Sequence, residues 1–252
     1  MGYSNKSIIL ATKENVLSTY KSRLHGLKAL SKYDGWFPIR ASPRLAGIVA
    51  DLMGDGHLQG EPKSRLDYSS NSVEELERFN SEIFCLFGLK GKIRKCTTNK
   101  YGTMNLGVNN KPLGRILRLI GVPTGAKVLT KFGVPYWILI DKKLFSRFIN
   151  RLFSCEATVD VKNKFIEIKM YKEISLISNM ISFFQEIEKF LFIYFNIKST
   201  KPFLDNSLNI RKDGKITRPV RLKIKRKEAL VNYQKHIGFD DLQKQVKLEK
   251  IT

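Results

Sequence analysis

The segment Leu45–Leu58, LAGIVADLMGDGHL, constrains the fold of this chain more than any other stretch of the sequence. Its first ten residues predict a helix that is apolar on almost every side, and such a helix is normally buried. The helix then ends in Gly54-Asp55-Gly56, a turn that places one carboxylate between two glycines. Because stability does not require an acid there, Asp55 is a candidate functional residue. The alternative is an ordinary turn aspartate.

The order of the expected elements repeats along the chain. After this helix, the sequence predicts a hairpin over residues 57–69, a capped helix over 72–88, a hairpin over 90–109 and a helix over 112–121. The same order recurs as a helix over 142–159, two strands, a helix over about 173–195, a hairpin turning at Asp213-Gly214, and a helix over about 227–236. A doubled unit of this kind predicts an α+β fold with two similar domains about a pseudo-twofold axis.

The same pattern gives expected domain boundaries. We expect an N-terminal basic extension over residues 1–42, a first domain over 43–121, a linker over 122–141 and a second domain over 142–252. Within the extension, one helix or two are expected, with an apolar set on roughly one face: Leu17, Tyr20, Leu24, Leu27 and Leu30.

The charge of the chain indicates a polyanionic partner. Lys and Arg number 45 against 23 Asp and Glu, which gives a formal charge of +22. An excess of this size favours nucleic acid, and the alternative is a generally basic protein without a special partner.

The sequence predicts no membrane segment, no disulfide framework and no zinc cluster. It holds no run of 18 apolar residues. The opening MGYSNKSIIL lacks the features of a secretory signal, so we expect an intracellular protein. The cysteines Cys85, Cys96 and Cys155 are scattered, and the three histidines show no ligand spacing.

Two motifs carry a resemblance to a known family. Residues 45–58 resemble the motif helix of LAGLIDADG homing endonucleases, with the family nonamer on Ile48–Gly56, and a second motif lies on 149-INRLFSCEA-157. Stretches that resemble the archaeal-type branch are 121-GVPTGAK-127, 134-VPYWI-138 and 237-IGFDDLQKQVKLEKI-251. The resemblance covers most of residues 43–252. It implies a monomer with two αββαββα domains that form a saddle of antiparallel sheets.

The resemblance also implies the site. In that family each motif helix delivers one acid to divalent metal ions over the DNA. By position the catalytic and metal-binding acids here are Asp55 and Glu156, with Mg²⁺ or Mn²⁺ as cofactor. The residue type agrees, because Mg²⁺ prefers carboxylate oxygens and metal ions assist hydrolysis of phosphate esters. For Glu156 the alternative is a surface acid that follows a helix.

Several positions depart from the family pattern. The basic residue expected near the first site is missing at Ser70-Asn71, whereas Lys172 remains near the second, where we expect it to stabilise charge or orient water. The missing lysine predicts that one half is catalytically weaker. Ala157 replaces a usual glycine after the second acid, and alanine costs stability there if the position needs positive φ.

Small residues predict a close approach of the two motif helices. Ala46, Ala50 and Gly54 form a stripe at a spacing of four. At the expected domain interface, the second helix carries Arg151 at the position that matches Ala50, and Cys155 at the position that matches Gly54. Arg151 is unusual there, as is Asp51 in the first helix. We therefore expect an ion pair between them, and the alternative places both in solvent on separate faces.

Alternation along two strands predicts the nucleic-acid contacts. In 220-VRLKIK-225, Arg221, Lys223 and Lys225 fall on the face opposite the apolar residues. Lys92 and Arg94 flank Ile93 in the same way. We expect these cations on the open face of each sheet, in contact with DNA. The alternative is that they are solvated strand residues.

The combined prediction is a site-specific homing endonuclease that hydrolyses both strands of a long duplex DNA target with divalent metal. Two alternatives share the fold: an RNA maturase with intron RNA as partner, and a catalytically inactive DNA-binding relative. The retained acids argue against the inactive relative, whereas a basic surface does not distinguish DNA from RNA. A nucleic-acid-packaging protein is disfavoured by the ordered repeat.

Overall fold

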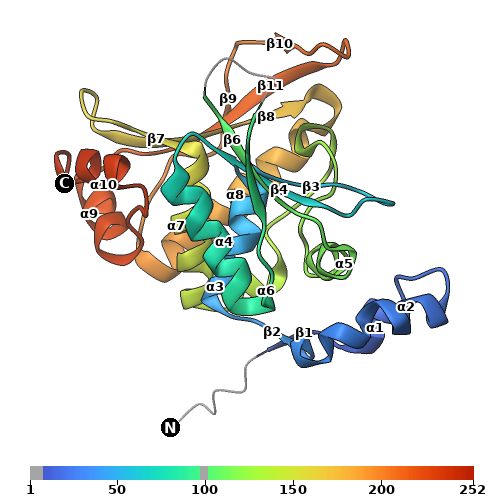
Figure 1. The fold of residues 1–252 in the computed structure, drawn as a ribbon. Coiled ribbons are helices and arrows are strands. Elements are labelled where there is room, and N and C mark those ends of the chain that lie inside the picture. Colours follow the sequence, from blue (N-terminus) through green and yellow to red (C-terminus); the bar gives the residue numbers. More distant parts are fainter. Residues whose placement is uncertain (1–7, 97–101) are drawn as a thin grey trace, which may run out of the picture. The chain divides into compact units, whose positions relative to one another are not determined.

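The computed structural model describes residues 8–96 and 102–252. These residues belong to two compact units, Met1–Thr124 and Gly125–Thr252, coloured from blue to green and from green to red in Figure 1. In the part of the chain that the structure describes, no helix combines the length and the apolar character needed to cross a bilayer.

The first unit is built around one antiparallel sheet. Its elements are α3 (Pro43–Met53), β3 (Gly56–Leu58), β4 (Leu66–Ser70), α4 (Val73–Phe87), β5 (Lys92–Lys95), β6 (Met104–Val108) and α5 (Lys111–Leu119). The strand order is β3-β4-β6-β5. Helix α4 packs on one face of the sheet, where the ring of Phe79 stacks on that of Tyr68 with centroids 4.5 Å apart. The turn predicted near residues 99–102 lies mostly outside the described residues.

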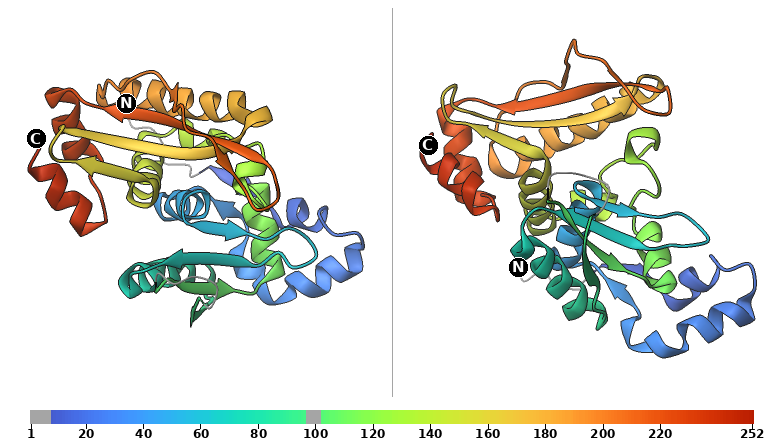
Figure 2. Two further views of the ribbon diagram at one scale, coloured as in Figure 1. Left: turned by 90° about the horizontal axis from the view of Figure 1, so that it is seen from above. Right: turned by 45° about the horizontal axis from the view of Figure 1, so that its top comes forward.

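The second unit repeats this order. Its main elements are α7 (Lys142–Glu156), β7 (Ala157–Asp160), β8 (Phe165–Glu173), α8 (Ile177–Phe195), β9 (Phe203–Leu204), β10 (Asn209–Ile210), β11 (Ile216–Ile224), α9 (Lys227–His236) and α10 (Leu242–Glu249). Short helical turns lie at η2 (Lys127–Leu129), α6 (Tyr136–Leu139) and η3 (Ile174–Leu176). The sheet order is β10-β11-β8-β7, with β9 also paired to β11. The long strands β8 and β11 run side by side in Figure 2.

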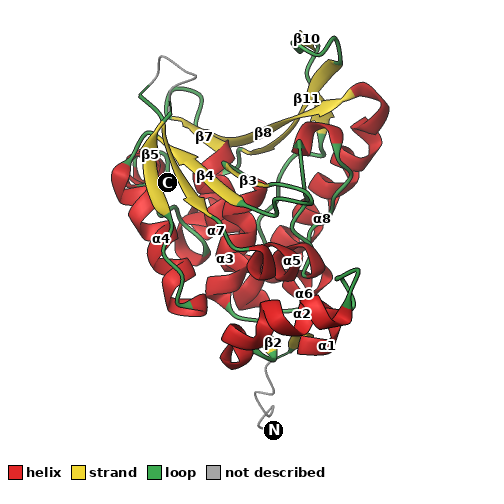
Figure 3. Cartoon of the chain, turned by 45° about the vertical axis from the view of Figure 1, so that its right-hand side comes forward, coloured by secondary structure: helices red, strands yellow, loops and turns green. Residues whose placement is uncertain are grey.

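The two sheets share one topology. In each, the first two strands form a hairpin, and the last strand of the unit lies beside the second: β3-β4-β6 in one unit and β7-β8-β11 in the other. All these pairings are antiparallel, and helices lie against the sheets in both units (Figure 3). The predicted α+β fold with a doubled helix-strand-strand order is therefore confirmed.

Local chemistry explains where these helices begin and end. Ser42 caps α3, with Pro43 in its first turn, where a missing N–H costs nothing. Ser72 caps α4 by accepting a hydrogen bond from the backbone N–H of Glu75 at 3.2 Å. Gly88 ends α4 with a φ of 65°, in the left-handed region that favours glycine. The capping predicted from the sequence for α4 is confirmed.

The N-terminal segment packs on the first unit. It contains β1 (Ile9–Ala11) paired with β2 (Ile39–Arg40), α1 (Lys13–Leu17), α2 (Arg23–Leu30) and η1 (Ser31–Trp36). The indole N–H of Trp36 donates to the carbonyl oxygen of Phe87 at 3.0 Å. The expected single leucine face is wrong: the chain turns between α1 and α2, so Leu30 is buried whereas Leu24 is 76% exposed.

Candidate nucleic-acid interface and acidic positions

Asp55 stands in the turn between α3 and β3. Helix α3 ends at Met53, and β3 begins at Gly56, so Gly54 and Asp55 alone connect them. Asp55 is exposed, whereas both flanking glycines are buried. A Cβ atom on Gly56 would lie 2.7 Å from the Cα atom of Leu52. Glycine therefore allows the strand to start directly against the helix, with the carboxylate of Asp55 outside.

Glu156 occupies the matching place in the second unit. It is the last residue of α7, and β7 starts at once with Ala157. Each acid thus immediately precedes the first strand of the main sheet in its unit, although α7 continues to its acid and α3 stops two residues before. Ala157 has φ of −92° and ψ of 155°, which is extended backbone. The positive φ that would make alanine costly is not present there.

Glu156 lines a cavity of about 420 Å³ in the second unit. Lys127, Lys169 and Tyr171 are the other polar side chains in its wall, and the remaining wall is Val128, Phe132, Met170 and Met180. A carboxylate beside two ammonium groups provides ligands both for a hydrated cation and for phosphate oxygens. Sequence reasoning missed Lys127 and Lys169. The alternation of β8, with Ile168 and Met170 buried, would have placed Lys169 on the open face.

Lys172 is buried next to this cavity and contacts the backbone of the segment that lines it. Its side chain is fully buried, on the same face of β8 as Ile168. The amine donates to the carbonyl oxygen of Lys127 at 2.8 Å and to that of Thr130, and lies 4.0 Å from the centroid of the Phe132 ring. Burial lowers the pKa of the Lys172 amine to about 8. The structure does not bring this amine into the cavity wall, and its predicted direct catalytic role stays a prediction.

The small residues predicted for the helix interface are buried within α3. Ala46 and Ala50 are inaccessible, and Gly54 is also buried. On α7, Arg151 is buried and Cys155 is half-buried. The contact between these two helices stays a prediction.

The two unusual charges have ion-pair partners in their own units. Asp51 accepts a hydrogen bond from the Arg78 guanidinium at 2.9 Å. Arg151 pairs with Asp240 at 3.1 Å, and Asp240 also pairs with Arg147 at 2.7 Å. Both Asp51 and Arg151 are buried, so the alternative that both lie in solvent is wrong. Their pairing with each other stays a prediction.

Asp240 links the C-terminal segment to α7. Burial by itself would raise the pKa of this carboxyl, but the charges of Arg147 and Arg151 lower it below its ordinary value. Farther along, the Lys244 amine donates to the carbonyl oxygens of Ser154 and Cys155 at the end of α7. These contacts hold the backbone that leads to Glu156.

In the second unit, the predicted cations Arg221 and Lys223 lie on the open face of the sheet but are not simply solvated. Val220, Leu222 and Ile224 are buried on the other face, as the alternation predicts. Glu167, opposite on β8, lies 2.9 Å from the Lys223 amine and 3.5 Å from the Arg221 guanidinium. Arg221 also pairs with Asp205. Lys225, beyond the end of the strand, is exposed.

In the first unit, the predicted cations Lys92 and Arg94 are exposed on β5. They pair in the ladder with Gly107 and Asn105 of β6, so these residues share one face of the sheet.

That face also carries polar residues which sequence reasoning missed. Arg65 pairs with Asp67 at 2.6 Å, and the amide of Asn105 donates to the Ser69 hydroxyl at 3.2 Å. The open face of this sheet is therefore polar and cationic, as a surface that contacts nucleic acid must be.

Asp55 and Glu156 are the predicted metal ligands, and this role stays a prediction. Within residues 8–96 and 102–252, no group of three or more His, Cys, Asp and Glu side chains could hold a metal ion by itself. Mg²⁺ commonly binds through one or two carboxylates, with water and phosphate oxygens completing its shell. Asp55 and Glu156 each offer one carboxylate of this kind.

Solved structures share this fold. The homing endonuclease I-WcaI, bound to its DNA recognition sequence, has a TM-score of 0.52 at 12% identity and covers 96% of this chain and 98% of its own. Mesophilic variants of the homing endonuclease I-DmoI have a TM-score of 0.51 at 15% identity and cover 77% of this chain and 88% of their own. A further I-DmoI variant, with target DNA and manganese, has a TM-score of 0.51 at 14% identity and covers 77% and 93%. The chain has the fold of LAGLIDADG homing endonucleases.

Sequence comparison finds two proteins of Methanocaldococcus jannaschii. The replication factor C small subunit is 29% identical over 201 residues, which are 69% of this chain and 11% of that protein. Glutamine–fructose-6-phosphate aminotransferase is 26% identical over 236 residues, which are 92% of this chain and 19% of that protein. The chain thus spans less than a fifth of the length of either relative. No family model matches the sequence.

Proposed function

We propose that this protein is a site-specific DNA endonuclease that hydrolyses both strands of a long duplex with the aid of divalent metal ions. One observation carries the proposal: each unit places an acid, Asp55 or Glu156, directly before the first strand of a sheet whose open face is polar and cationic. The duplex would lie along these open faces, and each acid would serve one strand.

Different residues of the chain would bind the metal, neutralise the phosphate and position the site. Asp55 and Glu156 would each supply a carboxylate ligand. Bound Mg²⁺ or Mn²⁺ would polarise the scissile phosphate and favour hydroxide as the nucleophile. Near Glu156, Lys169 would neutralise phosphate charge, and Lys172 would hold the segment that carries Lys127. The first unit lacks a lysine at residues 70–71, so its strand would be cut more slowly.

Cations farther from the acids would bind the duplex. Lys92 and Arg94 in one unit, and Arg221, Lys223 and Lys225 in the other, would contact phosphates or base edges. One chain carries both units, so it would act as a monomer, inside the cell where its substrate lies.

The comparisons support this proposal in two ways. Proteins with this fold include homing endonucleases bound to target DNA, one with manganese present. Moreover, two M. jannaschii proteins of unrelated named activities each match this chain over a minor part of their length. A segment shared in this way is expected of a module carried inside host proteins, so we propose intein- or intron-borne mobility for the chain.

The test is cleavage of a duplex library that contains candidate insertion sites, in Mg²⁺ or Mn²⁺, with and without EDTA. Asp55→Asn combined with Glu156→Gln should abolish cleavage and leave DNA binding largely intact, because both acids lie outside the core. Each single change should leave nicking of one strand. The exposed acids Asp213 and Glu249 provide the control pair, Asp213→Asn with Glu249→Gln, which should cut normally.

Three results would overturn this assignment. Cleavage by the Asp55, Glu156 double variant would remove the acids from the reaction, and cleavage in EDTA would remove the metal. Tight binding of a duplex site that is never cut would identify a DNA-binding protein without nuclease activity. Preferential binding of structured intron RNA, with no cleavage of DNA, would identify a maturase.

A further inference from the structure

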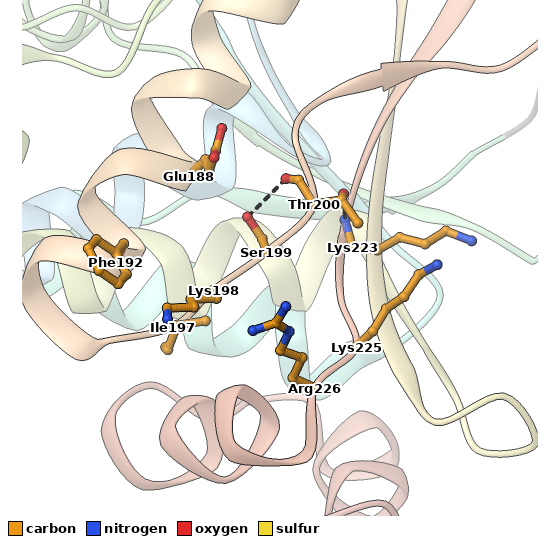
Figure 4. A pocket seen from close by; sticks show the side chains of 9 residues that line it. All are labelled: Glu188, Phe192, Ile197, Lys198, Ser199, Thr200, Lys223, Lys225 and Arg226. Carbon is orange, nitrogen blue, oxygen red and sulfur yellow. Dashed lines mark hydrogen bonds between the residues drawn. The ribbon is translucent and has the colours of Figure 1, made fainter.

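A second basic cavity lies in the second unit, beside the end of β11. It measures about 600 Å³, and Lys198, Lys223, Lys225 and Arg226 line it together with Glu188, Phe192, Ile197, Ser199 and Thr200. Figure 4 shows Lys223 extending from β11 and Lys225 from just beyond its end, while Arg226 points upward beneath Ser199. The loop that carries Thr200 is fixed to β11, because Thr200 and Lys223 exchange hydrogen bonds of 2.8 and 3.0 Å.

The cavity keeps a strong positive charge. Its single lining carboxylate, Glu188, is already paired with Lys201 at 2.7 Å. Among the residues that the structure describes, no carboxylate forms an ion pair with Lys198, Lys225 or Arg226. Arg226 is also the N-cap of α9, and its side chain makes no capping hydrogen bond. Backbone N–H groups at that helix start add a partial positive charge.

One wall of the cavity is an exposed aromatic ring. Phe192 of α8 is 49% exposed, and the Lys198 amine lies 5.8 Å from the centroid of its ring. Ile197, next to Lys198 in sequence, is fully buried and gives the cavity an apolar floor. An accessible aromatic face among cations can accept a base by stacking while the cations hold phosphates.

The positive surface continues beyond this cavity. An adjoining cavity of about 210 Å³ shares Lys225 and is lined also by Lys164, Lys227 and Lys250. No ion pair within residues 8–96 and 102–252 involves these three lysines. Cations along two joined cavities can follow several phosphates of one strand. A free phosphate would use neither the ring nor the extended track.

We propose that this cavity binds an unpaired nucleotide of a single-stranded nucleic acid, with the base against Phe192 and phosphates on Lys198, Lys225 and Arg226. The volume suits a ligand of that size, since small-molecule pockets span roughly 300–1,000 Å³. A base in a duplex is stacked between its neighbours and cannot lie on the ring. The strand can be DNA or RNA, because both present a base and a phosphate. This binding is independent of cleavage.

The experiment measures fluorescence anisotropy of labelled oligo-dT and oligo-U, each about eight nucleotides long, against the whole chain; a single aromatic platform needs only a few nucleotides. Phe192→Ala should weaken binding of the strand that uses the cavity by about tenfold, a typical loss for one stacked base. The control is Ile193→Ala, because Ile193 is a neighbour on α8 that is 55% exposed and does not line the cavity. It should bind as the wild type does.

A second pair of variants tests the phosphate contacts. Combined Lys198→Ala and Arg226→Ala should weaken binding and flatten its dependence on salt, because fewer counterions are released. Lys189→Ala, with an exposed lysine of α8 outside the cavity, is the charge control and should leave the salt slope closer to that of the wild type.

Matched ligands decide the outcome. An abasic oligomer of the same charge should bind the wild type and Phe192→Ala equally. If Phe192→Ala weakens the abasic oligomer or a duplex as much as the single strand, the cavity contacts backbone only and the proposal is wrong. The proposal is also wrong if Phe192→Ala binds oligo-dT as tightly as the wild type does and binds oligo-U as tightly as the wild type does. If Phe192→Ala weakens the binding of only one oligomer, oligo-dT or oligo-U, the cavity is specific for single-stranded DNA or for RNA, respectively. This result does not require that the protein cleaves DNA.

Discussion

The amine of Lys172 donates a hydrogen bond of 2.8 Å to the carbonyl oxygen of Lys127, across the wall of the cavity that Glu156 lines. A lysine on the buried face of β8 therefore holds in place a lysine that faces the cavity. The same amine reaches the carbonyl oxygen of Thr130, so the segment from Lys127 to Thr130 is fixed at both ends. Lys172 thus holds this segment through its backbone.

Replacing Lys172 by methionine should lower the free energy of unfolding. The change removes the charged donor of two hydrogen bonds, to the carbonyl oxygens of Lys127 and Thr130, and a hydrogen bond to a charged group contributes about 1.5–3 kcal/mol. Urea denaturation measures the loss. The control is Lys169→Met on the same strand, where the side chain faces the cavity. That variant should unfold as the wild type does and lose cleavage activity. Equal stability of Lys172→Met and wild type would contradict the positioning role.

Asp240 should make stability depend on pH in the acid range. Its folded pKa is lowered, so it contributes stability above its unfolded pKa of about 3.9, and this contribution is lost as pH falls through the folded pKa. At neutral pH, Asp240→Asn should cost about 3–5 kcal/mol, because Arg151 would remain buried with one charge partner fewer.

The cost of Asp240→Asn should shrink as the solution is acidified, since the wild-type carboxyl then also loses its charge. Thermal or urea unfolding between neutral and strongly acid pH measures the difference. Asp213→Asn is the comparison, because Asp213 lies in an exposed turn and should change stability little. A pH-independent cost at position 240 would show that charge is not the cause.

Glu167 should restrain DNA binding by holding two cations of the open face. Glu167→Gln removes the charge that lies 2.9 Å from Lys223 and 3.5 Å from Arg221. We expect tighter binding of duplex DNA and a steeper salt dependence, by roughly one unit of slope for each phosphate that a released cation neutralises. Filter binding over a range of salt concentrations measures both.

Two further variants serve as a charge control and as a test of the two cations. Glu249→Gln, on α10, changes the net charge equally at an exposed site and should leave the slope unchanged. Combined Arg221→Ala and Lys223→Ala should weaken binding and flatten the slope. If that double change leaves the slope as it was, these residues do not contact phosphates.

Gly56 and Ala157 occupy matching positions and should respond unequally to exchange. In Gly56→Ala the new Cβ would meet backbone of α3, 2.7 Å from the Cα atom of Leu52. Overpacking of this kind costs about 1–3 kcal/mol. Ala157→Gly creates no clash; it adds backbone entropy to the unfolded chain, about 0.5–1 kcal/mol, and removes one buried methyl group, about 0.8 kcal/mol. Urea unfolding should therefore rank Gly56→Ala as the less stable variant, and the reverse order would contradict the close approach seen at Gly56.

Local sequence signals were sufficient for most elements of the doubled order. The helix expected over 142–159 is too long, because it ends at Glu156 and β7 begins at Ala157, and Glu156 itself was placed by the family resemblance. Ser72 and Gly88 mark the ends of α4 because capping depends on neighbours three or four residues away. Val220, Leu222 and Ile224 mark the buried face of β11 because strand side chains alternate. Short-range physics is enough to interpret such patterns. The prediction of one apolar face in the N-terminal segment was wrong because a turn between α1 and α2 places the leucines on two separate helices.

Which charges meet depends instead on the folding of each unit. The ion pairs Arg151–Asp240 and Lys223–Glu167, and the hydrogen bond from the Lys172 amine to the backbone carbonyl of Lys127, join residues that are far apart in the sequence, so no local pattern fixes them. Whether a cation is buried, neutralised or exposed follows from what the fold brings beside it. Lys172 and Lys169 lie on one strand, yet the pleat sends one into the core and the other into the cavity with Glu156.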